Sequence, residues 1–208
     1  MIWNGYFRLY QICVYTSVPR VYYAIVSKLR SAGLPFTSVM SLVECVDCVL
    51  IISGAGEAGQ FGNRALALES LAEDPGVFKG QVFSKLNGGN DALLLGVDPG
   101  TRIGLAVFYG NASLEYSTFG NVMALSRRVG DFVRGVPARR CIVRVGNGSP
   151  SMTLRLVRLL KLESGKATIE VVDESGTSVG RVRVKGIQRD EGAAARIAFR
   201  KGEVVAFR

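Results

Sequence analysis

The sequence predicts an α/β protein of two domains, a small one over residues 1–88 and a larger one over residues 89–208. Three observations predict this class. Strand-like and helix-like segments alternate over the first 80 or so residues, which is typical of an α/β unit. A polar, glycine-rich break follows at residues 86–90. Beyond the break, three strands joined by tight turns precede a helix–strand–helix–strand–helix series.

In the first domain, each element follows from a local residue pattern. Residues 10–16 are β-branched and aromatic, which predicts a strand. Ser17 is a candidate helix cap, with Pro19 in the first turn, and apolar residues at helical spacing extend the helix over 21–32 until Gly33 ends it. We further expect a short strand near 36–40, a buried strand over 46–53 and a helix over 63–71.

The second domain is predicted in the same way. Three strands come first, at residues 91–97, 103–109 and 114–119. An amphipathic helix then covers residues 122–134. The remaining expected elements are a strand at 140–145, a helix at 152–162, a strand at 168–172 and a small-residue helix at 192–200.

Composition and charge exclude several classes of enzyme and favour a polyanionic partner. The 208 residues contain no histidine, which excludes Ser-His-Asp and Cys-His hydrolases and histidine-ligated zinc enzymes. The net charge is +9, and it is uneven: residues 1–90 hold 7 Lys/Arg and 6 Asp/Glu (net +1), whereas residues 91–208 hold 19 and 11 (net +8). The second half therefore suggests a surface that faces a polyanion, although a basic surface can also serve solubility alone.

Location and cysteine usage give further expectations. No stretch reaches the roughly 18 apolar residues of a membrane span, and the N-terminus lacks the pattern of a signal peptide, so we expect a soluble cytoplasmic protein with no membrane partner. We expect the four cysteines, Cys13, Cys45, Cys48 and Cys141, to be buried structural thiols rather than a disulfide framework. The lone CxxC at residues 45–48 leaves redox chemistry and metal binding as alternatives.

The glycine-rich run at residues 54–59, GAGEAG, matches the GxGxxG pattern of a dinucleotide-binding loop. It follows a strand, but a later one than that fingerprint requires. A nucleotide-binding regulator and a plain surface turn of small residues are both consistent with this run.

Acidic residues stand at the ends of three predicted core elements of the second domain. Asp98 ends its first strand, Asp173 and Glu174 end its fifth, and Asp190 and Glu191 open its last helix. Carboxylates at the carboxyl ends of strands project into the crevice where α/β sheets bind ligands. Oxygen ligands without histidine or thiolate select Mg²⁺ or Mn²⁺, and a carboxylate-bridged metal pair suits a phosphodiester. A turn, a helix cap and a polar strand exit would explain the same residues without metal.

Three motifs carry a family resemblance. The segments LGVDPGTRIGLA (95–106), VVDESGT (171–177) and DEGAAARIA (190–198) are similar to the first hairpin, the fifth strand and the last helix of RuvC/YqgF-type proteins of the RNase H-like superfamily. The resemblance covers about residues 91–200. It implies an RNase H-like mixed-sheet domain with Asp98, Glu174 and Asp190 as metal-binding catalytic acids, and Glu191 as the alternative to Asp190.

For function, the resemblance implies a Mg²⁺- or Mn²⁺-dependent endonuclease that cleaves structured DNA or RNA, of the Holliday-junction or RNA-processing type. Resolvases with this fold usually act as dimers, so a homodimer is an expected partner. Basic residues expected to contact nucleic acid are Arg102, Arg181, Arg183, Lys185 and Arg189. Residues 144–148, RVGNG, hold no acid where the RuvC branch carries a glutamate on strand four. This departure leaves a catalytically inactive nucleic-acid-binding protein as the alternative. The first domain is expected to recognise substrate or partner.

Overall fold

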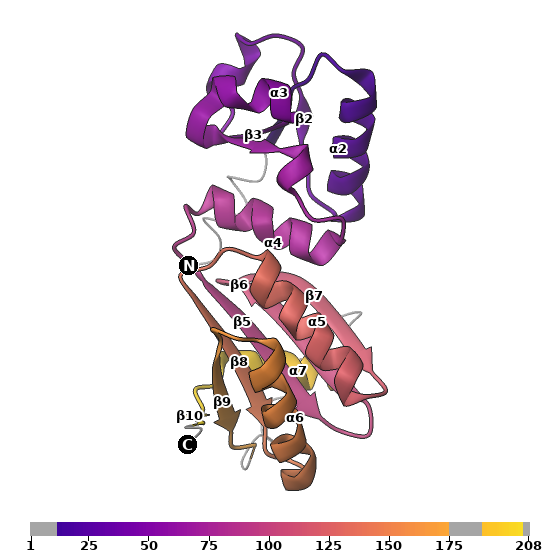
Figure 1. Cartoon of the computed structure of the whole chain (residues 1–208), viewed down its shortest axis with the longest axis vertical. Coiled ribbons are helices and arrows are strands. Elements are labelled where there is room, and N and C mark those ends of the chain that lie inside the picture. Colours follow the sequence, from indigo (N-terminus) through magenta and orange to yellow (C-terminus); the bar gives the residue numbers. More distant parts are fainter. Residues whose placement is uncertain (1–11, 175–188, 206–208) are drawn as a thin grey trace. The chain divides into compact units, whose positions relative to one another are not determined.

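Two sheets organise the protein, one in each half of the chain (Figure 1). The structure, a computed structural model, describes residues 12–174 and 189–205. It divides into two compact units, Met1–Gly89 and Asn90–Arg208. The first contains a four-stranded parallel sheet and the second a six-stranded mixed sheet, so the predicted α/β class is confirmed. None of the helices in residues 12–174 and 189–205 combines the length and the hydrophobicity that a membrane-spanning segment needs.

The sheet of the first unit is parallel throughout and has the order β2-β1-β3-β4. Its two central strands, β1 (Ile12–Val14) and β3 (Leu50–Ser53), are wholly buried, which is why they are apolar without alternation. The outer strands are β2 (Thr37–Ser38) and β4 (Ala65–Ala67). Helices α2 (Pro19–Ser31) and α4 (Pro75–Leu86) contribute Ile25, Leu29, Phe78 and Val82 to the core around this sheet.

Two expectations for strands and helices in the first unit are wrong. The helix expected over 63–71 is instead β4 between two short 3₁₀ helices, η2 (Gly59–Arg64) and η3 (Leu68–Ser70). The segment pairs with β3, so that sheet hydrogen bonds replace helical ones. The strand expected over 46–53 begins only at Leu50, because Glu44–Asp47 form another 3₁₀ helix, η1.

Helix termini in the first unit also differ from expectation. Ser17 does not cap α2, whose N-cap is Val18, because the Ser17 hydroxyl donates to Glu57 Oε1 at 2.7 Å. Helix α4 was not predicted at all. Asp74 caps it by accepting a hydrogen bond from Val77 N at 2.9 Å, and Pro75 occupies its first turn. The Asp74-Pro75-Gly76 sequence is therefore the start of a helix.

The cysteines contradict the expectation of free thiols, because Cys13 and Cys48 form a disulfide with a Cα–Cα distance of 5.9 Å. Cys13 lies on β1 and Cys48 just before β3, and the parallel pairing of these strands brings the two residues together. The CxxC motif is therefore not a redox pair, since Cys48 bonds to Cys13 rather than to Cys45. Cys45 and Cys141 are free, and burial raises the pKa of each thiol, which favours its protonated form.

The second unit has a mixed sheet with the order β10-β9-β8-β5-β6-β7. Strands β5 (Ala92–Pro99), β6 (Ile103–Tyr109) and β7 (Ala112–Phe119) are antiparallel neighbours, whereas β8 (Arg140–Gly146) and β9 (Thr168–Val172) run parallel to β5. The short strand β10 (Glu203–Val204), which was not predicted, pairs antiparallel with β9. The other strands fall where the sequence predicts them.

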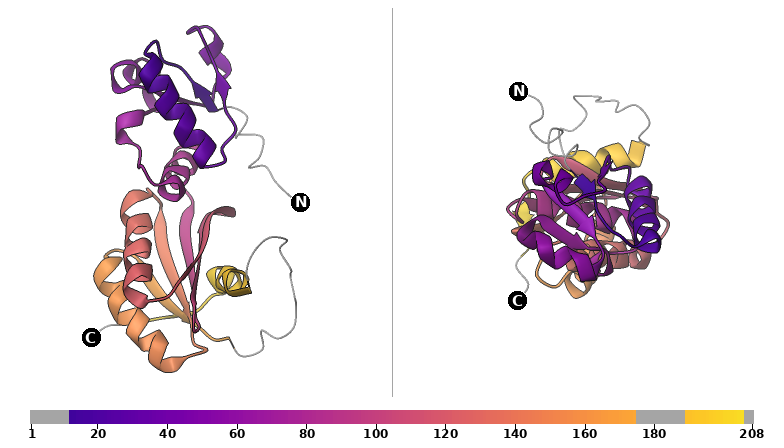
Figure 2. Two further views of the ribbon diagram at one scale, coloured as in Figure 1. Left: turned by 90° about the vertical axis from the view of Figure 1, so that its right-hand side faces the viewer. Right: turned by 90° about the horizontal axis from the view of Figure 1, so that it is seen from above.

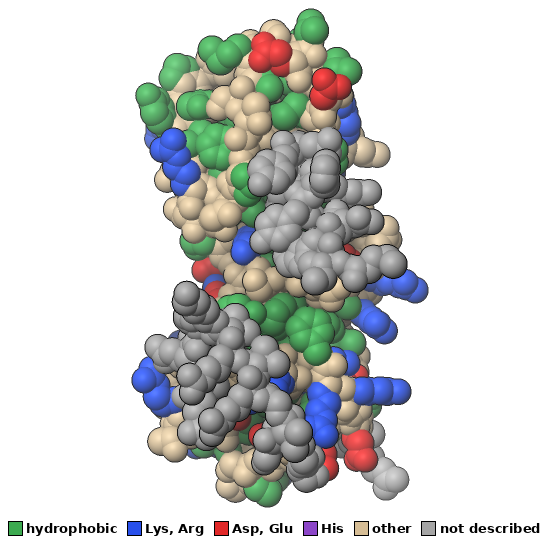
Figure 3. Space-filling view, turned by 180° about the vertical axis from the view of Figure 1, so that it is seen from behind, with side chains coloured by type: hydrophobic (Ala, Val, Ile, Leu, Met, Phe, Trp, Pro, Cys, Tyr) green, Lys and Arg blue, Asp and Glu red, His purple; other side chains and the backbone are tan. Residues whose placement is uncertain are grey.

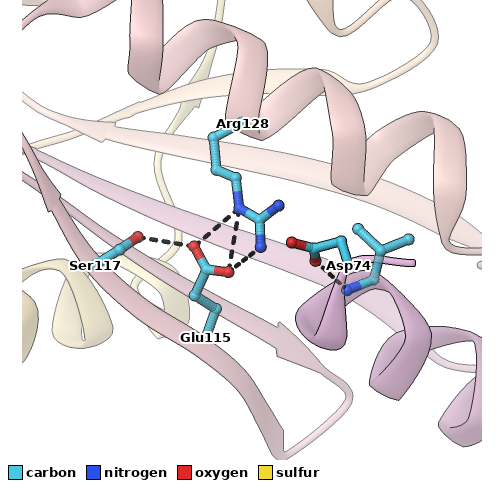
Figure 4. A network of polar contacts seen from close by, with 5 residues as sticks. Asp74, Glu115, Ser117 and Arg128 are labelled. Carbon is cyan, nitrogen blue, oxygen red and sulfur yellow. Dashed lines mark hydrogen bonds and ion pairs between the residues drawn. The ribbon is translucent and has the colours of Figure 1, made fainter. Parts of the chain in front are cut away.

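Three helices cover the two faces of this sheet. Helices α5 (Val122–Gly135) and α6 (Pro150–Glu163) pack on one face, and α7 (Arg189–Phe199) packs on the other (Figures 1 and 2). Helix α5 is tied to β7 by a half-buried ion pair (Figure 4). Arg128 Nε donates to the Glu115 carboxylate at 3.0 and 3.1 Å, and the Ser117 hydroxyl donates to the same group at 2.8 Å.

Helix α7 lies against the sheet at Gly96, where no side chain separates backbone from backbone. A Cβ at Gly96 would overlap the carbonyl oxygen of Ala194 and lie 2.6 Å from Ala198 N. Ala194 and Ala198 form a buried cluster with Ala106 and Phe108 of β6. The alanine-rich face of α7 is therefore matched to a glycine on the central strand, and a larger residue on either side would separate them.

The disulfide yields a prediction for stability. Its two cysteines are 35 residues apart in sequence. The chain-entropy model gives about 4 kcal/mol for a loop of this size. We expect the double variant Cys13→Ala/Cys48→Ala to lower the free energy of unfolding of the first unit by about that amount in urea under non-reducing conditions.

Cys45→Ala is the matched control, because Cys45 belongs to the same buried cluster but carries no disulfide. A second measurement is independent of stability: in denatured, non-reduced protein, alkylation should modify only two of the four cysteines, Cys45 and Cys141. Modification of all four would overturn the assignment.

Candidate functional site

The carboxyl ends of three adjacent parallel strands, β5, β8 and β9, form the candidate site. Val97 of β5 is in register with Val145 of β8, and Gly146 of β8 is in register with Val172 of β9. Asp98 directly follows Val97, and Asp173 and Glu174 directly follow Val172. The structure therefore brings Asp98 and Glu174 to the end of the sheet that is formed by the carboxyl ends of β5, β8 and β9. We call this end the carboxyl edge, and it is where α/β folds place their ligands.

Glu174 is held by the turn that follows β8. Gly148 N donates to Glu174 Oε1 at 3.0 Å, and Glu174 N donates to Asn147 Oδ1 at 2.9 Å. The Asn147 side-chain amide also donates to Asp173 Oδ1 at 3.2 Å, while Asn147 N donates to the Val172 carbonyl at 3.0 Å. These contacts join the ends of β8 and β9, and they fix the direction of a half-buried carboxylate.

Gly146 provides the space for that carboxylate. A Cβ at this position would overlap Glu174 Oε1 and lie 2.8 Å from Glu174 Cδ. The same Cβ would lie 2.9 Å from Ile197 Cδ1 of α7. The glycine therefore lets the Glu174 side chain and α7 meet over the end of β8. Sequence analysis singled out Glu174 but missed Asn147 and Gly148, for which the small, polar residues after the strand were the only signal.

Asp98 lies in the last part of β5, half-buried and in register with Gly104 of β6. The turn after it is tight, with Gly100 N donating to the Asp98 carbonyl at 3.0 Å. Arg102 is exposed in this turn, and its Nη2 donates to Thr118 Oγ1 at 2.9 Å. The predicted nucleic-acid contact Arg102 thus lies at the same end of the β5–β6 hairpin as Asp98.

Part of the predicted site lies outside the described residues. Arg181, Arg183 and Lys185 fall in the segment 175–188. Asp190 lies in the first turn of α7, one turn before Ala194, but the side chains of Arg189, Asp190 and Glu191 are not described. Among the described residues, no group of three acidic, cysteine or histidine side chains is arranged to hold a metal ion. The predicted trio includes Asp190, so this observation does not test it.

Arg144 of β8 belongs to the run 144–148, which holds no acid, and its side chain is bound to other parts of the unit. Its Nε donates to Glu170 Oε2 of β9 at 2.8 Å, and its Nη1 donates to the Ala198 carbonyl of α7 at 2.6 Å. Gly202 N donates to the same Glu170 oxygen at 3.2 Å. Both side chains are largely buried, 12% and 10% exposed, so the pair anchors the end of α7. Sequence analysis did not find this pair, because the two residues are 26 positions apart.

The glycine-rich run at residues 54–59 folds into a single short helical turn, α3 (Ala55–Ala58). Ala55 N donates to Glu69 Oε2 at 2.9 Å, and Ser17 N donates to Glu57 Oε1 at 2.7 Å. Burial alone would raise the pKa of Glu57, but hydrogen bonds from Thr16, Ser17 and Ser53 together lower it. One amide of the run, Ala55 N, is thus bound to a carboxylate of the protein itself, and this contact favours a surface turn over a phosphate-binding loop.

Comparison with known proteins adds no family to this description. No protein-family model matches the chain, and no curated protein matches it. The site is therefore interpreted from its own geometry and chemistry.

Gly146 provides a test of how the Glu174 carboxylate is held. We expect Gly146→Ala to destabilise the second unit by about 1–3 kcal/mol, since the added methyl group must displace Glu174 and press on Ile197. Urea unfolding and amide hydrogen exchange in β8 and β9 would measure the effect. Gly120→Ala is the control, because nothing lies within 4 Å of its Cβ position. Equal stability of the two variants would contradict the contact.

The buried pair predicts a second, larger effect. Arg144→Met leaves Glu170 buried without its cation, so we expect a loss of about 3–5 kcal/mol in the free energy of unfolding. Arg144→Met/Glu170→Leu should recover part of this loss, because neither charge then remains buried. Arg140→Met on the same strand is the control, since Arg140 is exposed. If Arg144→Met cost no more than Arg140→Met in urea unfolding, the anchoring role would be wrong.

Proposed function

We propose that the protein is a Mg²⁺- or Mn²⁺-dependent endonuclease that acts on structured nucleic acid through an RNase H-like second unit. The observation that carries the proposal is the position of Asp98 and Glu174 at the carboxyl ends of β5 and β9, the two parallel strands on either side of β8. The order of three antiparallel strands, helix, strand, helix, strand and helix supports it, since this is the order in which the resembling motifs occur. The close seating of α7 on Gly96, with Asp190 one turn from Ala194, also supports it.

The donor chemistry of this edge fits a hard divalent cation. Asp98 and Glu174 offer carboxylate oxygens, and there is no histidine in the chain to favour zinc. Asp98, Glu174 and Asp190 would hold the ion, with Glu191 as the alternative to Asp190. When bound, the ion would neutralise the acids and the developing charge on a phosphodiester. The chain itself orients Glu174 through Gly148 N and Asn147, and Arg102 would bind a flanking phosphate.

A second function, nucleic-acid binding without cleavage, is favoured by one observation. Residues 144–148, at the end of the fourth strand of the unit, hold no acid where the RuvC branch carries a glutamate, and the Arg144 side chain is bound to Glu170 and the Ala198 carbonyl. A site that lacks one acid can still bind nucleic acid by charge, because the second half of the chain has a net charge of +8. The fold alone does not decide between these two functions.

Asp98→Asn tests the endonuclease directly. Wild type and variant would be offered four-way junctions, duplex DNA, RNA:DNA hybrid and structured RNA, each with Mg²⁺ and with Mn²⁺. We expect cleavage of one of these substrates by wild type and a loss of at least about 100-fold in the variant, the scale on which one electrostatic group in an active site acts.

Asp131→Asn is the control, because Asp131 is an exposed α5 residue that pairs with Arg134. Asp190→Asn and Glu191→Gln, compared in the same assay, identify the third acid. Binding of a substrate by wild type without metal-dependent cleavage would reject the enzyme and leave the binding protein. A variant that cuts as fast as wild type would remove Asp98 from the site.

A further inference from the structure

We propose that the outer face of α6 binds the phosphate backbone of the nucleic acid and leads it to the carboxyl edge of the mixed sheet. This inference rests on the proposed function and names the surface that would hold the substrate beside the cleavage site. The occupant is a nucleic acid strand.

The residue pattern of α6 separates a buried face from a cationic one. Thr153, Leu156, Val157 and Leu160 are buried in the core of the unit. Arg155, Arg158 and Lys161 are exposed and follow one another at intervals of three residues. Six residues of helix span about 9 Å, which matches two or three successive phosphates of one strand at about 3.4 Å each along a duplex. The helix thus presents a short row of cations at the spacing of a polyanion.

The cations of α6 differ from other arginines of the unit in their surroundings. Arg128, Arg134 and Arg144 form ion pairs with acids of the protein. Arg155 and Arg158, by contrast, have no ion pair within the described ranges, and the only acid of α6 is Glu163 at its end. On the opposite face of the unit, Lys and Arg side chains are intermixed with Asp and Glu (Figure 3). Arg155 and Arg158 are therefore the two cations of α6 that we expect an external anion to contact.

The position of α6 connects this row to the candidate site. The helix begins at Pro150, directly after the turn that holds Glu174. Thr153 Oγ1, in its first turn, has two carbonyl acceptors within reach of its single proton, Gly146 at 2.8 Å and Ser149 at 2.9 Å. The N-terminal end of α6 is thereby bound to the end of β8. A strand lying along α6 would reach the edge where Asp98 and Glu174 stand.

A nucleic acid suits this face better than a membrane. A helix that lies on a membrane needs a free apolar face to insert. In α6 the apolar face is already packed in the core, and the exposed side carries cations with two separate leucines, Leu154 and Leu162. What remains exposed offers charge rather than a hydrophobic surface. Arginine binds phosphate through the positive charge and the planar set of N–H donors of its guanidinium group.

The test measures binding in EDTA, so that cleavage does not intervene. Affinity for a fluorescent four-way junction and for a single-stranded oligonucleotide would be measured over a series of salt concentrations with wild type and Arg155→Gln/Arg158→Gln. The matched control is Arg139→Gln/Arg140→Gln, two exposed arginines of the same unit at the start of β8, whose removal changes the net charge equally. We expect the α6 variant to lower the salt slope on the four-way junction by about 2 and the control variant to leave it unchanged.

The other possible results separate the α6 surface from the endonuclease proposal. Equal weakening by both variants would mean that net charge alone binds the nucleic acid, and it would overturn the assignment of α6. Unchanged binding by the α6 variant would place the substrate elsewhere, even if cleavage persists and the endonuclease stands. An α6-dependent slope without any cleavage would keep this surface and reject the endonuclease. Binding of wild type to anionic phospholipid vesicles through Arg155 and Arg158, with none to nucleic acid, would assign the face to a membrane.

Discussion

The close approach of α7 to the mixed sheet is the constraint on which the second unit depends. It requires a glycine at position 96, alanines at positions 194 and 198, and a buried cation at Arg144 that binds the Ala198 carbonyl. Small residues allow the backbones to touch, and the ion pair with Glu170 compensates both buried charges. Because Asp190 lies on the same helix as these contacts, the packing of α7 also determines where the last predicted acid stands relative to the sheet.

The ends of the parallel strands show how a local turn can prepare a site. Three consecutive residues at the end of β8 act together on Glu174. Gly146 has no side chain where the carboxylate lies, Gly148 donates its backbone amide to the carboxylate, and Asn147 accepts a hydrogen bond from the Glu174 amide. A carboxylate oriented in this way loses little conformational freedom when it binds a ligand, which is the physical basis of preorganisation. The arrangement is compatible with both proposed functions, since a held carboxylate can bind a cation whether or not cleavage follows.

The charge of the second unit is divided between structural and exposed arginines. Those that face an acid, such as Arg128 and Arg144, join helices to the sheet, and their charge is compensated within the protein. Arg155 and Arg158, on the outer face of α6, have no ion pair among the described residues, and it is this charge that we propose binds a partner. A net charge alone could not make this distinction. It depends on which positions of each helix face the core, and therefore on tertiary packing.

The sequence by itself determined the α/β class, most strands and helices, and the two carboxylates at the strand ends, because residue patterns and strand ends are local properties. It predicted residues 103–109 and 168–172 as strands with the observed bounds. Only the tertiary structure decided the Cys13–Cys48 disulfide, the Arg144–Glu170 pair and the strand at Ala65–Ala67. In the disulfide and the ion pair, the two partners are distant in the chain. At residues 65–67, pairing with β3 overrides the local helical pattern. Contacts of this kind exist only once parallel strands have aligned, and no spacing in the sequence records which residues will meet.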